Sequence, residues 1–302
     1  MQTSFVDAHH HLWDLEANPH YPWLLNPVQP SHMGDYSALQ KSYRLADYLA
    51  DFGSNPPVAS VHVEANWRDD DPVHETKWLQ TLADRAGYPQ AIVCYVDLAA
   101  DDAPAVLERQ AQFRNVRGVR RMVAPAGEGL PALRPGATIL CDQRFLKNLK
   151  LLRRFDLSFD LQATPAIMED AVRMADAHPD LPVALTHMGL PLDRSADGLS
   201  FWRHKLALMS RRPNVFVKLS GLAMLDPHWT PASIAANVRI VTDLFGPDRC
   251  MFGTNFPVDK LRAAPAALLT AFAASLTGFT DQERHAILAG TAARFYRLRI
   301  NN

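Results

Sequence analysis

The sequence has few cysteines, and their spacing does not suggest a disulfide framework. Cys94, Cys141 and Cys250 are the three cysteines among 302 residues. An odd number of widely separated cysteines is not typical of a small disulfide-stapled protein. We therefore expect each of them to be reduced and structural, because an isolated cysteine is more often a small buried apolar residue than a nucleophile.

The sequence also lacks a charge excess, a long apolar run and a secretory signal. Its formal net charge is −1 at pH 7, which gives no electrostatic reason to expect nucleic acid or an anionic membrane as a partner. No uninterrupted apolar run approaches the roughly 20 residues of a membrane helix. The first residues do not combine a basic segment with an apolar one. We expect a cytoplasmic protein that binds neither nucleic acid nor membrane.

A glycine-rich dinucleotide-binding turn is missing as well, although strand-like and helix-like segments alternate along the chain. With 48% hydrophobic residues, a chain of this length can bury a large core and suits one α/β barrel as well as two ordinary domains. Eight alternations predict a (β/α)8 TIM barrel, an α/β fold, as a single domain over residues 1–302, with a last helical segment at 281–296 covering one barrel end. The alternative is an open doubly wound sheet, which is less favoured without a Gly-x-Gly-x-x-Gly turn. We expect the strands at 5–13, 58–65, 90–98, 116–123, 157–162, 181–187, 215–220 and 248–255.

The first expected strand carries histidines on one face. Alternation along a strand points Asp7, His9 and His11 to one side and His10 to the other. Two imidazoles two residues apart on one face can converge on a metal ion or a small anion, so this pattern is a candidate site. The alternative is a histidine cluster on the surface.

A long polar segment at 14–40 follows this strand and is too long for a simple connection. An extended loop directly after a strand that bears a candidate site is often functional. The alternative is a surface loop that is packed by its own aromatic side chains, namely Trp13, Tyr21 and Trp23. A second loop, rich in glycine and proline, is expected at 124–137.

Polar residues occur near the C-terminal ends of most of the expected strands. In a parallel barrel these ends meet at one face, where barrel enzymes place their active sites. A structural polar network that fills the barrel mouth would produce the same pattern. The residues are His9, His11, His62, Glu64, Arg120, Asp160, Gln162, His187, Lys218 and Asn255.

Four motifs in chain order resemble those of the amidohydrolase superfamily. They are DAHHH at 7–11, similar to the strand-one D-x-H-x-H; THMG at 186–189, similar to T-H-x-G of strand six; KLSG at 218–221, similar to K-L-S-G of strand seven; and GTNFP at 253–257, similar to G-[ST]-D-x-P of strand eight. The resemblance spans practically the whole chain. It is closest to the branch that includes sugar lactonases, the 2-pyrone-4,6-dicarboxylate lactonase and metal-dependent decarboxylases, and within it to the lactonases.

By that resemblance, His9, His11 and His187 would bind a divalent metal ion or, as in metal-free members, hold the scissile carbonyl group themselves. Neutral imidazoles suit Zn²⁺ or Mn²⁺. Such an ion would polarise a lactone carbonyl and lower the pKa of its bound water. The resemblance therefore implies either a zinc or manganese enzyme or a metal-independent one.

The sequence departs from the family pattern after strand eight, where Asn255 stands in place of an aspartate. In the family that aspartate binds metal or takes a proton from water, and an amide cannot act as the base. Glu64 and Asp259 are the candidate replacements, with Glu64 slightly favoured because alternation turns it inward. The alternatives are a surface position for Asp259 and a structural ion pair for Glu64.

Cationic residues at the strand ends favour an anionic ligand. Arg120 would bind a substrate carboxylate through two parallel hydrogen bonds, and Lys218 could do so as a point charge. Together with His62 and Gln162 they form the expected substrate-binding set. Arg120 could instead form an ion pair with Asp160 or Glu64.

These features predict a hydrolase that opens a small carboxylated lactone, or another cyclic ester, of a sugar acid or an aromatic-degradation intermediate. One alternative is a non-oxidative decarboxylase that uses the same metal ion. The other is a non-catalytic relative that binds a small acid. Assembly into a homo-oligomer is left open.

Overall fold

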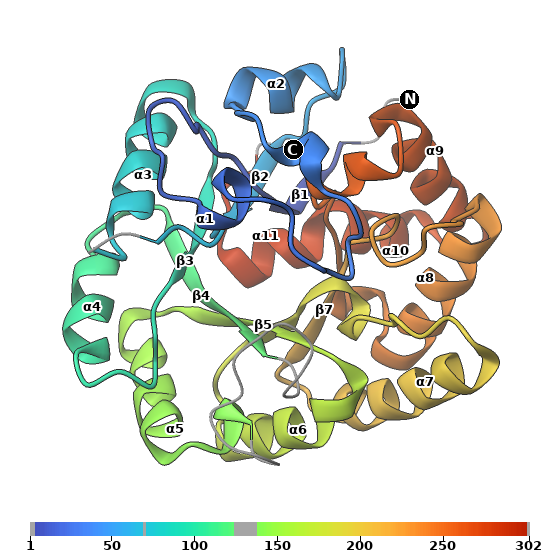
Figure 1. The fold of residues 1–302 in the computed structure, drawn as a ribbon. Coiled ribbons are helices and arrows are strands. Elements are labelled where there is room, and N and C mark those ends of the chain that lie inside the picture. The colour runs from blue at the N-terminus through green and yellow to red at the C-terminus, as the bar shows by residue number, and fades with distance from the viewer. Residues whose placement is uncertain (1–3, 69–70, 124–137, 301–302) are drawn as a thin grey trace.

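The chain folds around one sheet of eight parallel strands, which run in the order β1 to β8 (Figure 1). The computed structural model describes residues 4–68, 71–123 and 138–300, so the loop expected at 124–137 lies outside the described residues. The strands are β1 (Val6–His10), β2 (Ala59–Val63), β3 (Ala91–Tyr95), β4 (Val116–Val123), β5 (Ser158–Ala163), β6 (Val183–Leu185), β7 (Val215–Leu219) and β8 (Cys250–Phe252).

Backbone hydrogen bonds join the two edges of this sheet. The amide of Asn255, just after β8, donates to the carbonyl of His9 at 2.7 Å, and the amide of His11 donates to the carbonyl of Phe256 at 2.8 Å. These bonds bring the last strand beside the first one. The predicted (β/α)8 barrel is confirmed.

Helices alternate with the strands and surround the barrel (Figure 1). Their ends carry the expected signals: the Asp142 side chain accepts hydrogen bonds from two amides at the start of α5, and Pro231 opens α8. Within the described ranges, no helix has the length and apolar character that crossing a membrane requires. The helices are α1 (Pro22–Leu25), α2 (Leu45–Ala50), α3 (His74–Ala86), α4 (Ala103–Gln110), α5 (Gln143–Leu149), α6 (Met168–Ala177), α7 (Ala196–Ser210), α8 (Pro231–Phe245), α9 (Pro265–Ser275), α10 (Asp281–His285) and α11 (Thr291–Tyr296).

Apolar side chains from the strands fill the barrel interior together with the last helix. Val6, Ala59 and Ala91 belong to one buried cluster with Phe295 and Tyr296 of α11. A π-helical turn connects α10 to α11. The last helical segment therefore covers the N-terminal end of the strands, as predicted, and leaves the C-terminal ends for a site.

A bulge in β1 changes which of its side chains share a face. Asp7 and His10 are three residues apart, whereas their partners on β2 are two apart. The Asp7 carboxylate accepts a hydrogen bond at 2.9 Å from the hydroxyl of Tyr48 on α2, outside the barrel. The prediction that Asp7 points to the same side as His9 and His11 is therefore wrong, because the extra residue resets the alternation.

Several of the predicted strands end earlier than expected, and for β6 and β8 this affects candidate site residues. β6 ends before His187 and β8 ends before Asn255, so both residues lie on turns beyond their strands. Both have left-handed backbone conformations, with φ of 51° and 56°. Such conformations are uncommon for residues other than glycine and cluster at functional sites.

The cysteines form no disulfide bonds. Cys94 and Cys250 are buried and Cys141 is exposed. The expected buried, structural role therefore fits Cys94 and Cys250 but does not extend to Cys141.

Candidate active site

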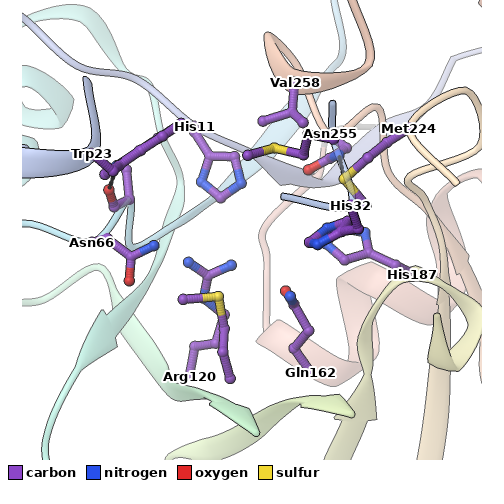
Figure 2. Close-up of a pocket in the computed structure, with 13 residues that line it drawn as sticks. His11, Trp23, His32, Asn66, Arg120, Gln162, His187, Met224, Asn255 and Val258 are labelled. Carbon is purple, nitrogen blue, oxygen red and sulfur yellow. Dashed lines mark hydrogen bonds between the residues drawn. The ribbon is translucent and has the colours of Figure 1, made fainter. Parts of the chain in front are cut away.

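A pocket lies at the C-terminal ends of the strands, with about 510 Å³ of empty space including its open side (Figure 2). Its wall combines polar and apolar side chains, which come from the barrel strands and from the surrounding loops. The lining residues are His11, Trp23, His32, Met33, Ala65, Asn66, Arg120, Met122, Gln162, His187, Met224, Asn255 and Val258.

Three histidines predicted to act together lie beside one another at this mouth. The ring centroids of His9 and His187 are 4.5 Å apart, and those of His9 and His11 are 5.1 Å apart. All three side chains are buried. His11 and His187 line the pocket, whereas His9 lies behind them.

Hydrogen bonds determine how the two pocket histidines present their rings. Nδ1 of His11 donates to the carbonyl of Val63 at 2.7 Å, because a carbonyl can only accept. The Nε2 atom of this ring therefore carries a lone pair when the ring is neutral. Nδ1 of His187 shares a hydrogen bond with the hydroxyl of Ser220 at 3.0 Å.

The electrostatic surroundings keep these imidazoles neutral. Burial lowers the pKa of His9, His11 and His187 well below the usual histidine value, and the positive charge of Arg120 adds to this effect. Neutral imidazoles can accept a proton or coordinate a metal ion, but they contribute no charge to the pocket at neutral pH.

The described residues meet the requirements of a metal site only in part. Both ring nitrogens of His9 are buried without a hydrogen-bond partner, and a neutral imidazole is a good zinc ligand. However, no three His, Cys, Asp or Glu side chains in the described part of the chain form a group that could hold a metal ion. The described side chains do not complete a metal site, so the binding of Zn²⁺ or Mn²⁺ stays a prediction.

Glu64, the favoured candidate base, forms an ion pair with Arg120. Its Oε1 accepts from Nε of Arg120 at 2.7 Å, and its Oε2 accepts from the amide of Asn66 at 2.8 Å. A second guanidinium nitrogen of Arg120 donates to the Glu64 carbonyl. Glu64 does not line the pocket, whereas Arg120 does. Glu64 therefore forms the structural ion pair that the sequence left open as the alternative to a catalytic role.

Asp259, the other candidate base, is buried behind Asn255. Its Oδ2 accepts from Nδ2 of Asn255 at 2.7 Å, and its Oδ1 accepts from the amides of Ala223 at 2.6 Å and Met224 at 3.3 Å. Burial raises the pKa of Asp259 to about 7, although these three hydrogen bonds oppose the shift. Asp259 is 0% exposed, so the alternative of a surface charge is wrong. It also does not line the pocket, whereas Asn255 does.

Lys218 and His62, two of the expected substrate-binding residues, do not line the pocket. Nζ of Lys218 lies 2.6 Å from Oδ2 of Asp160, and both side chains are fully buried. Nε2 of His62 accepts from the amide of Leu12 at 2.9 Å. The valines on either side of His62 belong to the interior cluster, so alternation turns His62 away from the barrel interior. Of the expected substrate-binding residues, Arg120 and Gln162 remain in the pocket.

The long loop after β1 contributes to the pocket wall. Trp23, His32 and Met33 of this loop line the pocket. The indole of Trp23 donates to the carbonyl of Ala65 at 2.9 Å and also contacts the Trp13 ring edge-on. The loop thus lines the pocket and is also packed by its own aromatic side chains, so the two interpretations left open by the sequence do not exclude each other.

A second contact holds this loop against the end of β2. The hydroxyl of Tyr21 donates to Oε1 of Glu75 on α3 at 3.3 Å, and the amide of Ala65 donates to the same oxygen at 3.0 Å. Burial first, and the nearby negative charge of Glu64 second, raise the pKa of Glu75 to about 8. Glu75 therefore holds the loop mainly as a neutral carboxylic acid at pH 7.

Sequence reasoning missed eight of the thirteen lining residues. The position of the loop directly after the first strand was the available signal for three of these residues. Asn66 and Met224 follow predicted strands, but a loop residue has no periodicity that would show its direction. The missed residues are Trp23, His32, Met33, Ala65, Asn66, Met122, Met224 and Val258.

The fold and the pocket together define a class, namely a (β/α)8 barrel with an enzyme-type site at the C-terminal ends of its strands. The chain belongs to the amidohydrolase family, whose profile matches residues 6–298. The family resemblance that the four motifs predicted is confirmed.

Individual relatives cover nearly the full length of the chain. It is 37% identical over 295 residues to an uncharacterized protein of Sinorhizobium fredii, covering 98% of this chain and 99% of that protein. It is 29% identical over 310 residues to an L-fucono-1,5-lactonase of Burkholderia multivorans, covering 97% and 96% of the two chains. An amidohydrolase structure from Burkholderia multivorans with bound zinc has a TM-score of 0.80 and 27% identity, covering 98% of this chain and 100% of that one.

Proposed function

We propose that the protein hydrolyses a small carboxylated lactone, or another cyclic ester, derived from a sugar acid or an aromatic-degradation intermediate. The observation that carries the proposal is the pairing of two neutral imidazoles, His11 and His187, with the guanidinium of Arg120 in one pocket. The family is one of hydrolases, and relatives at lower identity are lactonases. The family and these relatives do not specify which ester is hydrolysed, so the choice of a carboxylated lactone is our proposal.

The charge of the pocket favours an anionic substrate. No carboxylate occurs among the described lining residues, whereas Arg120 contributes a guanidinium group and Gln162 and Asn66 contribute amides. Glu64 neutralises part of the Arg120 charge but occupies only Nε and one terminal nitrogen. The guanidinium has five N–H donors, so others remain for a substrate carboxylate or for the developing oxyanion.

When no metal ion is bound, His11 is the favoured proton acceptor for water, since its Nδ1 is already engaged as a donor and its Nε2 is left as the acceptor. Nε2 takes a proton from a water molecule whose oxygen forms a bond to the lactone carbonyl carbon. The ester bond between this carbon and the ring oxygen then breaks. The proton passes from the imidazolium to the leaving alkoxide, which gives a hydroxy acid and returns the imidazole to its neutral form.

A screen of carboxylated lactones and aromatic acids tests the proposal. Lactone opening yields a carboxylic acid that ionises at pH 7, so proton release without CO₂ release is the expected outcome. Release of CO₂ from an aromatic acid would support the decarboxylase alternative. Ligand binding, measured by calorimetry, without either product would support the non-catalytic alternative.

The metal prediction needs a separate experiment. Elemental analysis of protein purified without a chelator is expected to show zinc or manganese, because the family resemblance implies such an ion. Full activity in protein that contains neither metal would favour hydrolysis by the imidazoles and Arg120 alone. Full loss of activity on chelation, with recovery on addition of Zn²⁺, would show that hydrolysis requires the metal ion and would contradict proton transfer from water to His11.

A further inference from the structure

The orientation of the Asn255 side chain is determined from behind the pocket. Asp259 uses Oδ1 to accept from the amides of Ala223 and Met224, and Oδ2 to accept from Nδ2 of Asn255. In its ionised form, which these three donors favour, the Asp259 carboxylate can only accept hydrogen bonds. Asn255 must therefore direct its Nδ2 toward Asp259, where it also lies 3.6 Å from Sδ of Met224. This arrangement leaves Oδ1 as the atom that Asn255 can offer to a ligand.

We infer that Asp259 is a positioning residue that makes Asn255 an acceptor-only contact of the pocket, and that Oδ1 of Asn255 binds an O–H group. This inference rests on the proposed function and deepens it. Two sources can supply that group: a hydroxyl of the substrate, or the water molecule that attacks the carbonyl carbon. In both cases Asn255 orients a hydrogen-bond donor and does not remove its proton.

The same geometry gives a physical reason for the departure from the family pattern. An aspartate at 255 would place a second carboxylate within hydrogen-bond distance of the buried Asp259, where Asn255 now lies at 2.7 Å. Two adjacent carboxylates in a buried site cannot both be ionised without a large cost. Asparagine avoids this repulsion and still presents an oxygen to the pocket.

An isosteric change at 259 should reverse the amide without changing the shape of the site. In Asp259→Asn, the new Oδ1 must face the amides of Ala223 and Met224, since an NH₂ group cannot accept from them. The Nδ2 of the new asparagine then points at Asn255. Asn255 has to turn its Oδ1 toward this donor, which moves the Nδ2 of Asn255 into the pocket. The pocket gains a donor where it had an acceptor, and we expect kcat/KM to fall by roughly 10- to 100-fold.

Exchanging the two residues should restore the acceptor. In the double variant Asn255→Asp with Asp259→Asn, the new amide at 259 donates to one oxygen of the new carboxylate at 255. The other oxygen of that carboxylate again faces the pocket. We expect the double variant to recover most of the activity lost in Asp259→Asn, which a purely structural role of Asp259 would not produce.

Two comparisons complete the activity experiment. Asp51→Asn is the matched control. It removes a partly buried carboxylate that binds Lys260, the residue that follows Asp259, and it does not change a residue that lines the pocket. Lactones with and without free hydroxyl groups separate the two sources of the O–H donor. A loss confined to hydroxylated lactones identifies a substrate hydroxyl, whereas an equal fall in kcat for all lactones identifies the attacking water.

A measurement without substrate keeps this inference separate from the proposed function. In NMR spectra, the side-chain NH₂ protons of Asn255, assigned by their absence in Asn255→Asp, should show the protection and shift of a hydrogen bond to a carboxylate. Exposure of these protons to solvent in the wild-type protein would overturn the inference even if lactones are hydrolysed. Unchanged kcat/KM in Asp259→Asn, or a double variant no better than it, would also overturn it. If Asp259→Asn does not fold, the NMR result for the wild-type protein decides.

Discussion

Two buried carboxylates at the barrel mouth have different roles because they have different hydrogen-bond partners. Glu64 and Asp259 are both buried carboxylates near the strand ends. Glu64 lies against a guanidinium group, whereas Asp259 lies against an amide and two backbone N–H groups. The first therefore compensates the charge of Arg120, and the second orients Asn255. Neither carboxylate lines the pocket.

Replacing Arg120 by methionine is expected to lower kcat/KM for carboxylated lactones. The change removes a substrate contact and leaves Glu64 as an unpaired buried carboxylate, so the loss should be about 2–5 kcal/mol in kcat/KM, expressed mostly in KM. Steady-state kinetics with a carboxylated and a neutral lactone provide the measurement. Glu64→Gln is the matched control, because it breaks the ion pair while keeping the guanidinium. An equal loss on both substrates would show that Arg120 has a structural role.

Replacing His11 by asparagine distinguishes the roles of the two ring nitrogens of His11. The asparagine Nδ2 can donate to the Val63 carbonyl in place of Nδ1, but the variant lacks the Nε2 acceptor. If Nε2 takes the proton from water, kcat should fall by roughly 10²–10⁴-fold with little change in KM or in stability. His62→Gln serves as the control, since its side-chain oxygen can replace Nε2 as the acceptor for the Leu12 amide. Retention of wild-type kcat in His11→Asn would rule out His11 as the base.

At the scale of single elements, the last helix is connected to the strands by a buried polar group. The hydroxyl of Tyr296 on α11 donates to the Asp160 carboxylate on β5, with distances of 2.8 and 2.9 Å to its two oxygens. Nζ of Lys218 on β7 approaches the same carboxylate and lies 5.0 Å from the Tyr296 ring centroid. One aspartate thus connects two strands with the helix that closes the barrel.

Removing the Tyr296 hydroxyl should destabilise the fold without altering catalysis. In Tyr296→Phe the carboxylate of Asp160 keeps Lys218 but loses one donor, which should lower the free energy of unfolding by about 1–3 kcal/mol. Denaturant unfolding measures this loss, and steady-state kinetics should show unchanged kcat and KM. A large fall in kcat at unchanged stability would instead mean that the hydrogen bond between Tyr296 and Asp160 affects the geometry of the pocket.

For the whole molecule, the buried carboxylic acid of Glu75 links stability to pH. Its pKa rises from an ordinary 4.5 to about 8 in the folded chain. Between these two values the folded state holds a proton that the unfolded state has released. Stability from this group is therefore fully present below pH 4.5 and is lost as pH rises toward 8, by up to about 1.4 kcal/mol per pH unit.

Glu75→Gln should remove this dependence. A glutamine can still accept from the Ala65 amide and the Tyr21 hydroxyl through its oxygen, but it does not ionise. Unfolding free energies are measured for both proteins from pH 5 to 8. As pH rises, the stability of the variant relative to the wild-type protein should increase. The buried histidines act in the opposite direction below pH 6.5, and the comparison of the two proteins cancels their contribution. Glu108→Gln, an exposed change on α4, should follow the wild-type curve.

Local periodicity was enough to predict the barrel and the neighbourhood of its site. Alternating apolar strands and amphipathic helices are properties of short segments, and the C-terminal ends of parallel strands necessarily meet at one face. The closeness of His9, His11 and His187 follows from this rule. The bounds of β4 were also predicted as observed.

The family and the barrel were thus determined by the sequence itself, through motif order and repeated alternation. Only the tertiary structure decided which charge faces which. The bulge in β1 turned Asp7 outward, Arg120 paired with Glu64 rather than Asp160, and Lys218 took Asp160. These outcomes depend on distances between strands and on burial, which set the energy of an ion pair and leave no periodic trace in the chain.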